Sequence, residues 1–110
     1  MLKTEVIEKV RKTCNTADSE VLENAIQRLE MKIAELLGKK YDESKKEITA
    51  EGFDDMYFAY LMAETYMLAE DWDCYEIYSK IYEKRYSEYV ATVIRNSPGK
   101  AYDFKDWRCH

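Results

Sequence analysis

Residues that interrupt regular structure are scarce in this chain, which has three glycines and one proline among its 110 residues. Because glycine and proline are the strongest local markers of turns, their rarity predicts a small number of long elements. A chain of this length is enough for one domain with one core. Its composition, 46% hydrophobic and 35% charged, is far from that of disordered, collagenous or membrane proteins.

The most regular hydrophobic pattern lies between Ser19 and Lys40, where apolar residues recur at steps of four and three. This spacing places them on one face of a helix. Gly38, followed by two lysines, is typical of a helix end, because glycine adopts the left-handed conformation and lysine faces the negative end of the helix dipole. A shorter helix is expected before it, from Glu5 to Thr13, and the polar stretch "CNTADS" between the two supplies capping oxygens.

Two further helices are predicted after a charged connection, which holds at most a short extended piece at residues 48–50. Asp54 and Asp55 supply first-turn acids to the first of them, whose apolar surface is broad enough to be buried by more than one neighbour. Asp73 and Glu76 have the spacing of a capping box, which predicts that the last helix starts there. Pro98 cannot continue that helix, so we expect it to end near Asn96.

These elements predict an all-α fold. It is a small bundle of three main helices plus a short N-terminal helix, formed by residues 1–96, with an extended aromatic C-terminal tail at residues 97–110. The residues expected to contribute most of the core are Leu22, Ile26, Leu29, Ile33, Leu36, Tyr57, Leu61, Leu68, Tyr78, Tyr82, Tyr86 and Tyr89.

The last predicted helix carries its tyrosines on one stripe, which indicates packing against a neighbouring helix. A buried hydroxyl needs a partner, however, and tyrosine suits interfaces that are apolar at one end and wet at the other. We therefore expect this helix to lie between its own core and another subunit. The tail aromatics need a binding site as well, either on their own bundle or on a neighbouring chain. The candidate subunit or partner interface consists of Tyr75, Tyr78, Tyr86, Tyr89, Tyr102, Phe104 and Trp107.

Charge and composition exclude several classes of function. The net charge of −5 disfavours nucleic-acid binding, because affinity for phosphate comes mainly from clustered lysine and arginine. The basic pairs Lys39/Lys40 and Lys45/Lys46 are interrupted by acids and are interpreted as a solvated loop. The longest uncharged apolar run, Met56 to Ala63, is too short to cross a bilayer. We expect a soluble, intracellular protein whose three cysteines are reduced.

The sequence contains few residues of the kinds that catalysis or metal binding requires. His110 is the only histidine, and no cysteine or serine sits in a recognisable histidine-containing motif, so no metal, cofactor or enzymatic activity is expected. Glu64 falls on the apolar face of its predicted helix. It is either a buried acid with a raised pKa or, the interpretation we favour, an acid with an arginine or tyrosine partner or an edge position.

The segment from Phe53 to Val90 resembles a family of small proteins encoded in the head-to-tail region of tailed bacteriophages and prophages. Its Tyr-rich "D-x-x-Y-x-x-Y-L-x-A" motif, acidic turn, Tyr-containing helix and spaced tail aromatics have matching positions here. The upstream "L-E-x-x-I" at Leu29, Glu30 and Ile33 is also similar to that family. The matching positions are Asp54, Tyr57, Tyr60, Leu61, Ala63, Glu70, Tyr75, Tyr86, Phe104 and Trp107.

This resemblance implies a structural head-to-tail connector, or adaptor, subunit that performs no chemistry. Such a subunit forms a ring that joins the portal vertex to the tail and lets DNA pass, so its partners are other copies of itself, the portal protein and tail-completion proteins. It would assemble in the bacterial host cytoplasm and reside at the virion neck. Two alternatives stay open from the residues: a small helical protein-binding or regulatory module, and an enzyme with a scattered site around Glu64.

Overall fold

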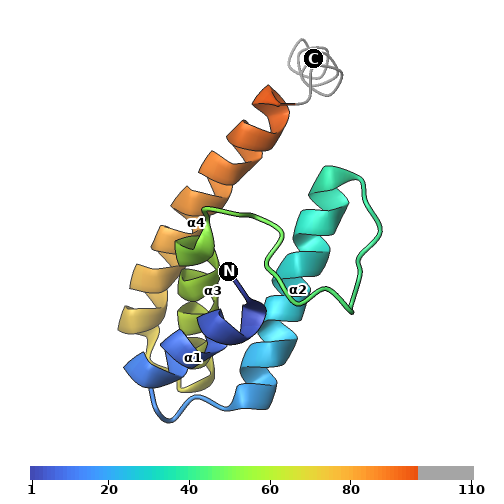
Figure 1. Cartoon of the computed structure of the whole chain (residues 1–110). Coiled ribbons are helices and arrows are strands. Elements are labelled where there is room, and N and C mark those ends of the chain that lie inside the picture. The colour runs from blue at the N-terminus through green and yellow to red at the C-terminus, as the bar shows by residue number, and fades with distance from the viewer. Residues whose placement is uncertain (97–110) are drawn as a thin grey trace.

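The computed structural model describes residues 1–96, which form four α-helices (Figure 1). The bounds are α1 (Lys3–Thr13), α2 (Ser19–Leu37), α3 (Asp54–Leu68) and α4 (Trp72–Arg95). The predicted all-α fold, with three main helices and a short N-terminal one, is confirmed. The predicted tail, with Tyr102, Phe104 and Trp107, lies outside the described residues.

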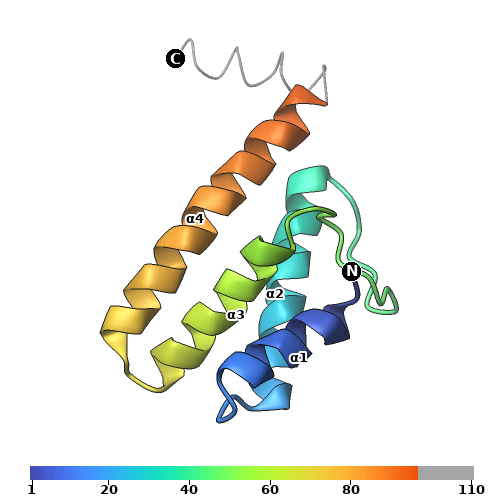
Figure 2. The ribbon, with the colours of Figure 1, turned by 60° about the vertical axis from the view of Figure 1, so that its left-hand side comes forward.

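Helix α3 is the centre of the bundle and packs against each of the other three helices. Helices α1 and α2 lie on one flank of it, and α4 runs back along the other flank after a tight turn (Figures 1 and 2). With 24 residues against 15 in α3, α4 continues past the start of its neighbour. Its C-terminal end therefore extends beyond the start of α3 (Figure 2), while Tyr89 and Val93 in its last turns still pack into the core.

The helix ends show where local sequence signals were sufficient. Gly38 adopts the predicted left-handed conformation, with φ of 67°, and ends α2. Helix α4 ends at the cap residue Asn96, as predicted. Its start was predicted wrongly: the capping carboxylate belongs to Asp71, which accepts from the Cys74 backbone N–H at 3.3 Å, so Asp73 lies inside the first turn. Glu70, with φ of 58°, reverses the chain just before Asp71, and this turn places the helix start two residues earlier.

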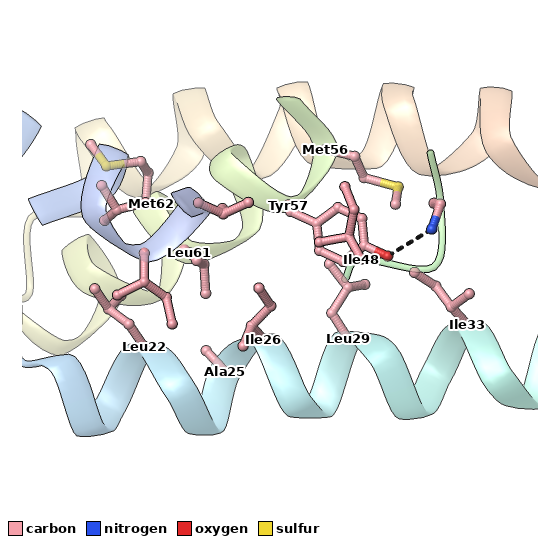
Figure 3. Close-up of a cluster of buried hydrophobic side chains, with 14 of the residues drawn as sticks. Leu22, Ala25, Ile26, Leu29, Ile33, Ile48, Met56, Tyr57, Leu61 and Met62 are labelled. Atoms are coloured by element: carbon pink, nitrogen blue, oxygen red, sulfur yellow. Dashed lines mark hydrogen bonds between the residues drawn. The ribbon is translucent and has the colours of Figure 1, made fainter. Parts of the chain in front are cut away.

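The hydrophobic core lies between α2, α3 and α1, and Figure 3 shows the α2 stripe facing the side chains of α3. The predicted burial of the central positions is confirmed: Leu22, Leu29, Ile33, Tyr57 and Leu61 have 1% or less of their surface exposed. Burying such side chains stabilises the fold by about 1.5–3 kcal/mol each. The buried members of the core are Val6, Ile7, Val10, Ala17, Leu22, Ala25, Ile26, Leu29, Ile33, Ile48, Ala50, Met56, Tyr57, Leu61, Met62, Tyr89 and Val93.

The prediction that Leu68 belongs to the core is wrong, because this side chain is 59% exposed. It occupies the final position of α3, where the bundle ends and no helix covers it. Leu36, Tyr78, Tyr82 and Tyr86 are half-buried and pack against the core from its edge. The three tyrosines remain half-buried because α4 packs mainly on α3, so part of each ring faces solvent.

The connection between α2 and α3 is more than a solvated loop. Its lysines are exposed as expected, but Ile48 and Ala50 are 1% exposed and belong to the core. A single antiparallel bridge joins Leu2 to Glu47, so the start of the chain and the connection support one another.

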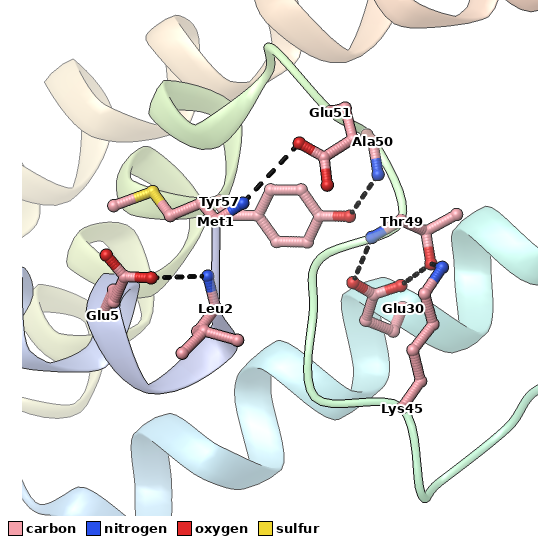
Figure 4. Close-up of polar contacts among 9 residues, drawn as sticks. All are labelled: Met1, Leu2, Glu5, Glu30, Lys45, Thr49, Ala50, Glu51 and Tyr57. Atoms are coloured by element: carbon pink, nitrogen blue, oxygen red, sulfur yellow. Dashed lines mark hydrogen bonds and ion pairs between the residues drawn. The ribbon is translucent and has the colours of Figure 1, made fainter.

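Polar groups beneath the connection fix its path (Figure 4). Glu30, 3% exposed, accepts hydrogen bonds from the backbone N–H and the hydroxyl of Thr49, at 3.0 and 2.6 Å. The backbone N–H of Ala50 donates to the Tyr57 hydroxyl at 3.1 Å. Burial of the phenol is the main cause that raises the pKa of Tyr57 above its ordinary value. Each of these backbone donors would be costly to bury without a partner, so this network anchors the connection on the core.

Candidate interaction surfaces

A row of aromatic rings joins α3 to α4, and we call it the aromatic seam. Its contacts are edge-to-face or tilted, apart from the stacked pair Tyr66 and Tyr78, whose centroids are 5.8 Å apart. Rings at such distances add to the free energy of area burial. The seam therefore holds α4 on α3. The remaining ring pairs are Phe53 with Tyr89 at 5.1 Å, Phe58 with Tyr78 at 6.3 Å, Tyr60 with Tyr82 at 5.0 Å, and Tyr82 with Tyr86 at 5.7 Å.

Lys32 connects the seam to α2. Its ammonium lies 4.3 Å from the centroid of the Tyr86 ring and donates to the Tyr82 hydroxyl at 3.3 Å. Burial raises the pKa of Tyr82 to about 12. Burial likewise raises the pKa of Tyr86, against the opposing effect of the Lys32 charge. These phenols are neutral at physiological pH and serve as packing groups with a wet edge.

Arg85 ties α4 to the start of α3. Its Nε lies 2.9 Å from an Asp55 carboxylate oxygen, and its Nη1 lies 2.6 Å from a Glu88 carboxylate oxygen. The guanidinium also stacks 4.5 Å from the centroid of the Phe53 ring. Three contacts to one planar cation fix its orientation, as expected of arginine rather than lysine.

The predicted interface residues of α4 lie along or beside this seam. Tyr89 is buried against Phe53, and Tyr78 and Tyr86 are half-buried among the rings. Tyr75 is also half-buried and makes an edge contact with Trp72 at 5.8 Å. The structure thus gives these rings intramolecular partners and leaves Tyr75, Tyr78 and Tyr86 partly exposed.

Glu64 has the arginine partner that the sequence favoured. The Arg28 guanidinium of α2 donates to it at 2.6 Å across the α2–α3 pair, and the Glu64 side chain is 18% exposed. Glu64 is therefore not an isolated buried acid, which was the other interpretation of its position. Glu64 here links two helices.

Sequence reasoning missed the large apolar side chains that are most exposed on the α3–α4 hairpin. Leu68, Trp72 and Ile77 are 58–59% exposed and Ile81 is 43% exposed. Ile77 and Ile81 lie one helical turn apart on the same side of α4. The available signal was that both fall off the tyrosine stripe while remaining apolar. Trp72 lies about half a turn round α4 from Ile81, so Ile77 and Ile81 are the pair that exposes apolar surface on one side of this helix.

A groove of about 510 Å³ opens at the end of the bundle where the α1–α2 and α3–α4 turns meet, and we call it the end groove. Its floor is mainly apolar, and two capping carboxylates, of Asp18 and Asp71, stand at its edge. Trp72 follows directly after Asp71. The lining residues are Cys14, Thr16, Ala17, Asp18, Val21, Thr65, Tyr66, Leu68, Ala69 and Asp71.

A second hollow, of about 700 Å³, lies between α1, α2 and the connection. Leu2, Ile7 and Ile26 provide apolar surface, and lysines and glutamates both surround it. Within residues 1–96 there is no group of three or more histidine, cysteine or acidic side chains placed to hold a metal ion. No helix in the same part of the chain is long and apolar enough to cross a membrane.

Comparisons with models of protein families, with curated proteins and with solved structures find no match to this chain.

Proposed function

We propose that this chain is a structural head-to-tail connector (adaptor) subunit of a tailed phage or prophage. It would form a ring that joins the portal vertex to the tail and lets DNA pass, and would reside at the virion neck after assembly in the host cytoplasm. Its work would be binding to copies of itself, to the portal protein and to tail-completion proteins.

The observation that carries the proposal is the uncovered apolar surface of the α3–α4 hairpin. Four large apolar side chains, Leu68, Trp72, Ile77 and Ile81, are each at least 43% exposed in a domain of fewer than a hundred described residues. Ile77 and Ile81 lie one helical turn apart on α4, and a subunit surface on that side of the helix would remove both from water.

The sequence resemblance supports the same proposal through the fold. Its motif residues Tyr57, Leu61 and Ala63 are buried in α3, and Asp54 begins that helix. The motif is therefore a determinant of how the hairpin packs, and the binding surface is formed by neighbouring residues that the motif leaves outside. The net charge of −5 suits a channel that DNA passes without adhering.

Co-assembly tests the proposal. The chain is mixed with the portal and tail-completion proteins encoded by the neighbouring genes, and complexes are followed by negative-stain microscopy and light scattering. We expect collars bound to the portal. The double variant Ile77→Ser and Ile81→Ser should lose them while keeping its helix content, whereas a chain truncated after Ser97 tests the contribution of the tail. A folded monomer that ignores the portal and tail proteins would refute the proposal.

The end groove favours a second candidate, a small helical protein-binding or regulatory module. A groove with an apolar floor fits a partner segment without any ring. A stable monomer that binds a host protein, and neither the portal nor the tail proteins, would establish this function in place of the connector.

A further inference from the structure

The end groove combines three properties that occur together nowhere else among the described residues. It has an apolar floor, its lining includes the highly exposed Leu68, and the carboxylates of Asp18 and Asp71 stand at its edge. The exposed Trp72 follows Asp71 in the chain. Glu20, Glu70 and Asp73 lie within two residues of these two aspartates in the chain.

The carboxylates of this border are not neutralised within the described part of the molecule. The ion pairs found there involve Glu51, Asp55, Glu64, Glu76 and Glu88, and none involves a carboxylate of the groove. Asp18 and Asp71 each accept a hydrogen bond from a helix-start backbone N–H, which leaves their charge in place. The nearest cations in the chain, Arg11 and Lys12, lie on the last turn of α1 and line a separate hollow with Glu8 and Asn15.

We propose that the end groove binds a basic amphipathic helix of a partner protein. Leucine-like side chains of that helix would lie on the groove floor and against Leu68 and Trp72, and its lysines or arginines would pair with the surrounding carboxylates. This is the arrangement by which an apolar groove recognises an amphipathic helix, with charge setting the orientation and the approach. The inference names the partner chemistry of one surface of the connector proposed above and in that sense rests on that function.

Trp72 provides the measurement, because its exposed indole should shift its emission to shorter wavelength when a partner covers it. A chain truncated after Ser97 keeps all four helices of the bundle. Because the truncation removes Trp107, Trp72 is then the only tryptophan left. The probe is a synthetic helical peptide of about 18 residues, or five turns, with leucine at steps of three and four and lysine elsewhere. We expect saturable binding with a blue shift, weakened as salt is raised. The full-length chain, followed by calorimetry, should bind the same peptide.

Variants locate the binding. Leu68→Ser should weaken the peptide about tenfold, since one apolar contact is lost. Glu20→Lys with Asp73→Lys should weaken it several-fold and should reverse the preference in favour of a glutamate-containing peptide of the same leucine pattern. Neither position is a helix cap, so both variants should keep the fold. The matched control is Glu35→Lys with Glu83→Lys, which reverses two exposed carboxylates away from the groove and changes the net charge by the same amount; it should bind the lysine peptide as the parent chain does.

The outcomes separate this inference from the proposed function. Equal weakening by Glu35→Lys with Glu83→Lys and by Glu20→Lys with Asp73→Lys would mean attraction to overall charge and would overturn the inference. Concentration-dependent self-association that Leu68→Ser abolishes, without binding of the peptide, would assign the groove to a second copy and would also overturn it. Portal collars that form normally with Leu68→Ser, together with failure of peptide binding, would reject the groove site while leaving the connector function standing.

Discussion

The two flanks of α3 differ in the type of side chain that packs there and in how completely it is buried. Toward α1 and α2, aliphatic side chains such as Leu29 and Ile33 are excluded from water, and the few polar groups there are satisfied by the hydrogen bonds of Glu30 and Tyr57. Toward α4, the aromatic rings other than the buried Tyr89 are half-buried, and the Tyr82 hydroxyl accepts a hydrogen bond from Lys32. The first flank specifies the fold, and the second holds a long helix whose outer surface stays available for another molecule.

The largest contrast should come from removing aliphatic volume on each flank. Leu29→Ala deletes a side chain that is 1% exposed and should lower the free energy of unfolding by about 3 kcal/mol, because it leaves a cavity. Ile81→Ala, at a position 43% exposed, should change it by less than about 0.5 kcal/mol. Urea denaturation followed by circular dichroism measures both. Similar losses for the two variants would show that α4 is covered on its outer face in the isolated chain.

A smaller effect is expected from the buried polar network. Glu30→Ala removes the acceptor of the Thr49 N–H and hydroxyl and should cost about 2 kcal/mol, because buried donors lose their partner. Hydrogen exchange at the Thr49 amide should accelerate in the same variant. Glu35→Ala, at an exposed position of the same helix, is the control and should stay within about 0.5 kcal/mol. Unchanged exchange at Thr49 would mean that the connection is held without Glu30.

The smallest expected effect is a loss of folding stability at alkaline pH, to which the tyrosines of the two flanks contribute differently. Burial raises the pKa of Tyr82 to about 12 and raises that of Tyr57 as well, from the ordinary value of 10.0. A phenol that holds its proton more tightly when folded stabilises the fold fully below pH 10. This contribution is lost as the pH rises from there through the folded pKa, because the unfolded chain ionises first. Stability should therefore fall above pH 10.

The variants Tyr57→Phe and Tyr82→Phe test which flank causes that fall. Tyr57→Phe should flatten the alkaline dependence more, because its phenol is fully buried, whereas solvent screens the half-exposed Tyr82. Denaturation curves collected on both sides of pH 10, beside the phenolate absorbance, give the comparison. A steeper alkaline loss in Tyr57→Phe than in Tyr82→Phe would contradict the assignment of the dry flank.

Prediction from sequence succeeded where neighbours in the chain decide the outcome. The α2 stripe, the left-handed Gly38 and the helix end at Asn96 depend on helical periodicity and local conformation, and each is found as expected. It failed for Leu68, because an apolar residue at helical spacing is buried only if another element covers that turn. The exposure of Ile77 and Ile81 was missed for the same reason, since only the packing of α4 on one neighbouring helix leaves their side of it uncovered.

The connection and the end groove depended on residues far apart in the chain. The burial of Ile48 and Ala50 follows from the pairing of Thr49 with Glu30 and of Ala50 with Tyr57, whose partners lie 19 and 7 residues away. No local pattern in a charged segment predicts such contacts. The end groove likewise forms only where the turns after α1 and α3 meet.

The sequence by itself determined the class of fold, the central helix stripes and most helix ends, because these are set by backbone preference and by the period of 3.6 residues per turn. Only the tertiary structure decided which apolar side chains remain in water. That choice depends on how many neighbours each helix has: α3 is covered by three helices, and α4 mainly by one. The uncovered side of α4 and the groove at its start are the surfaces to which the proposed functions are assigned.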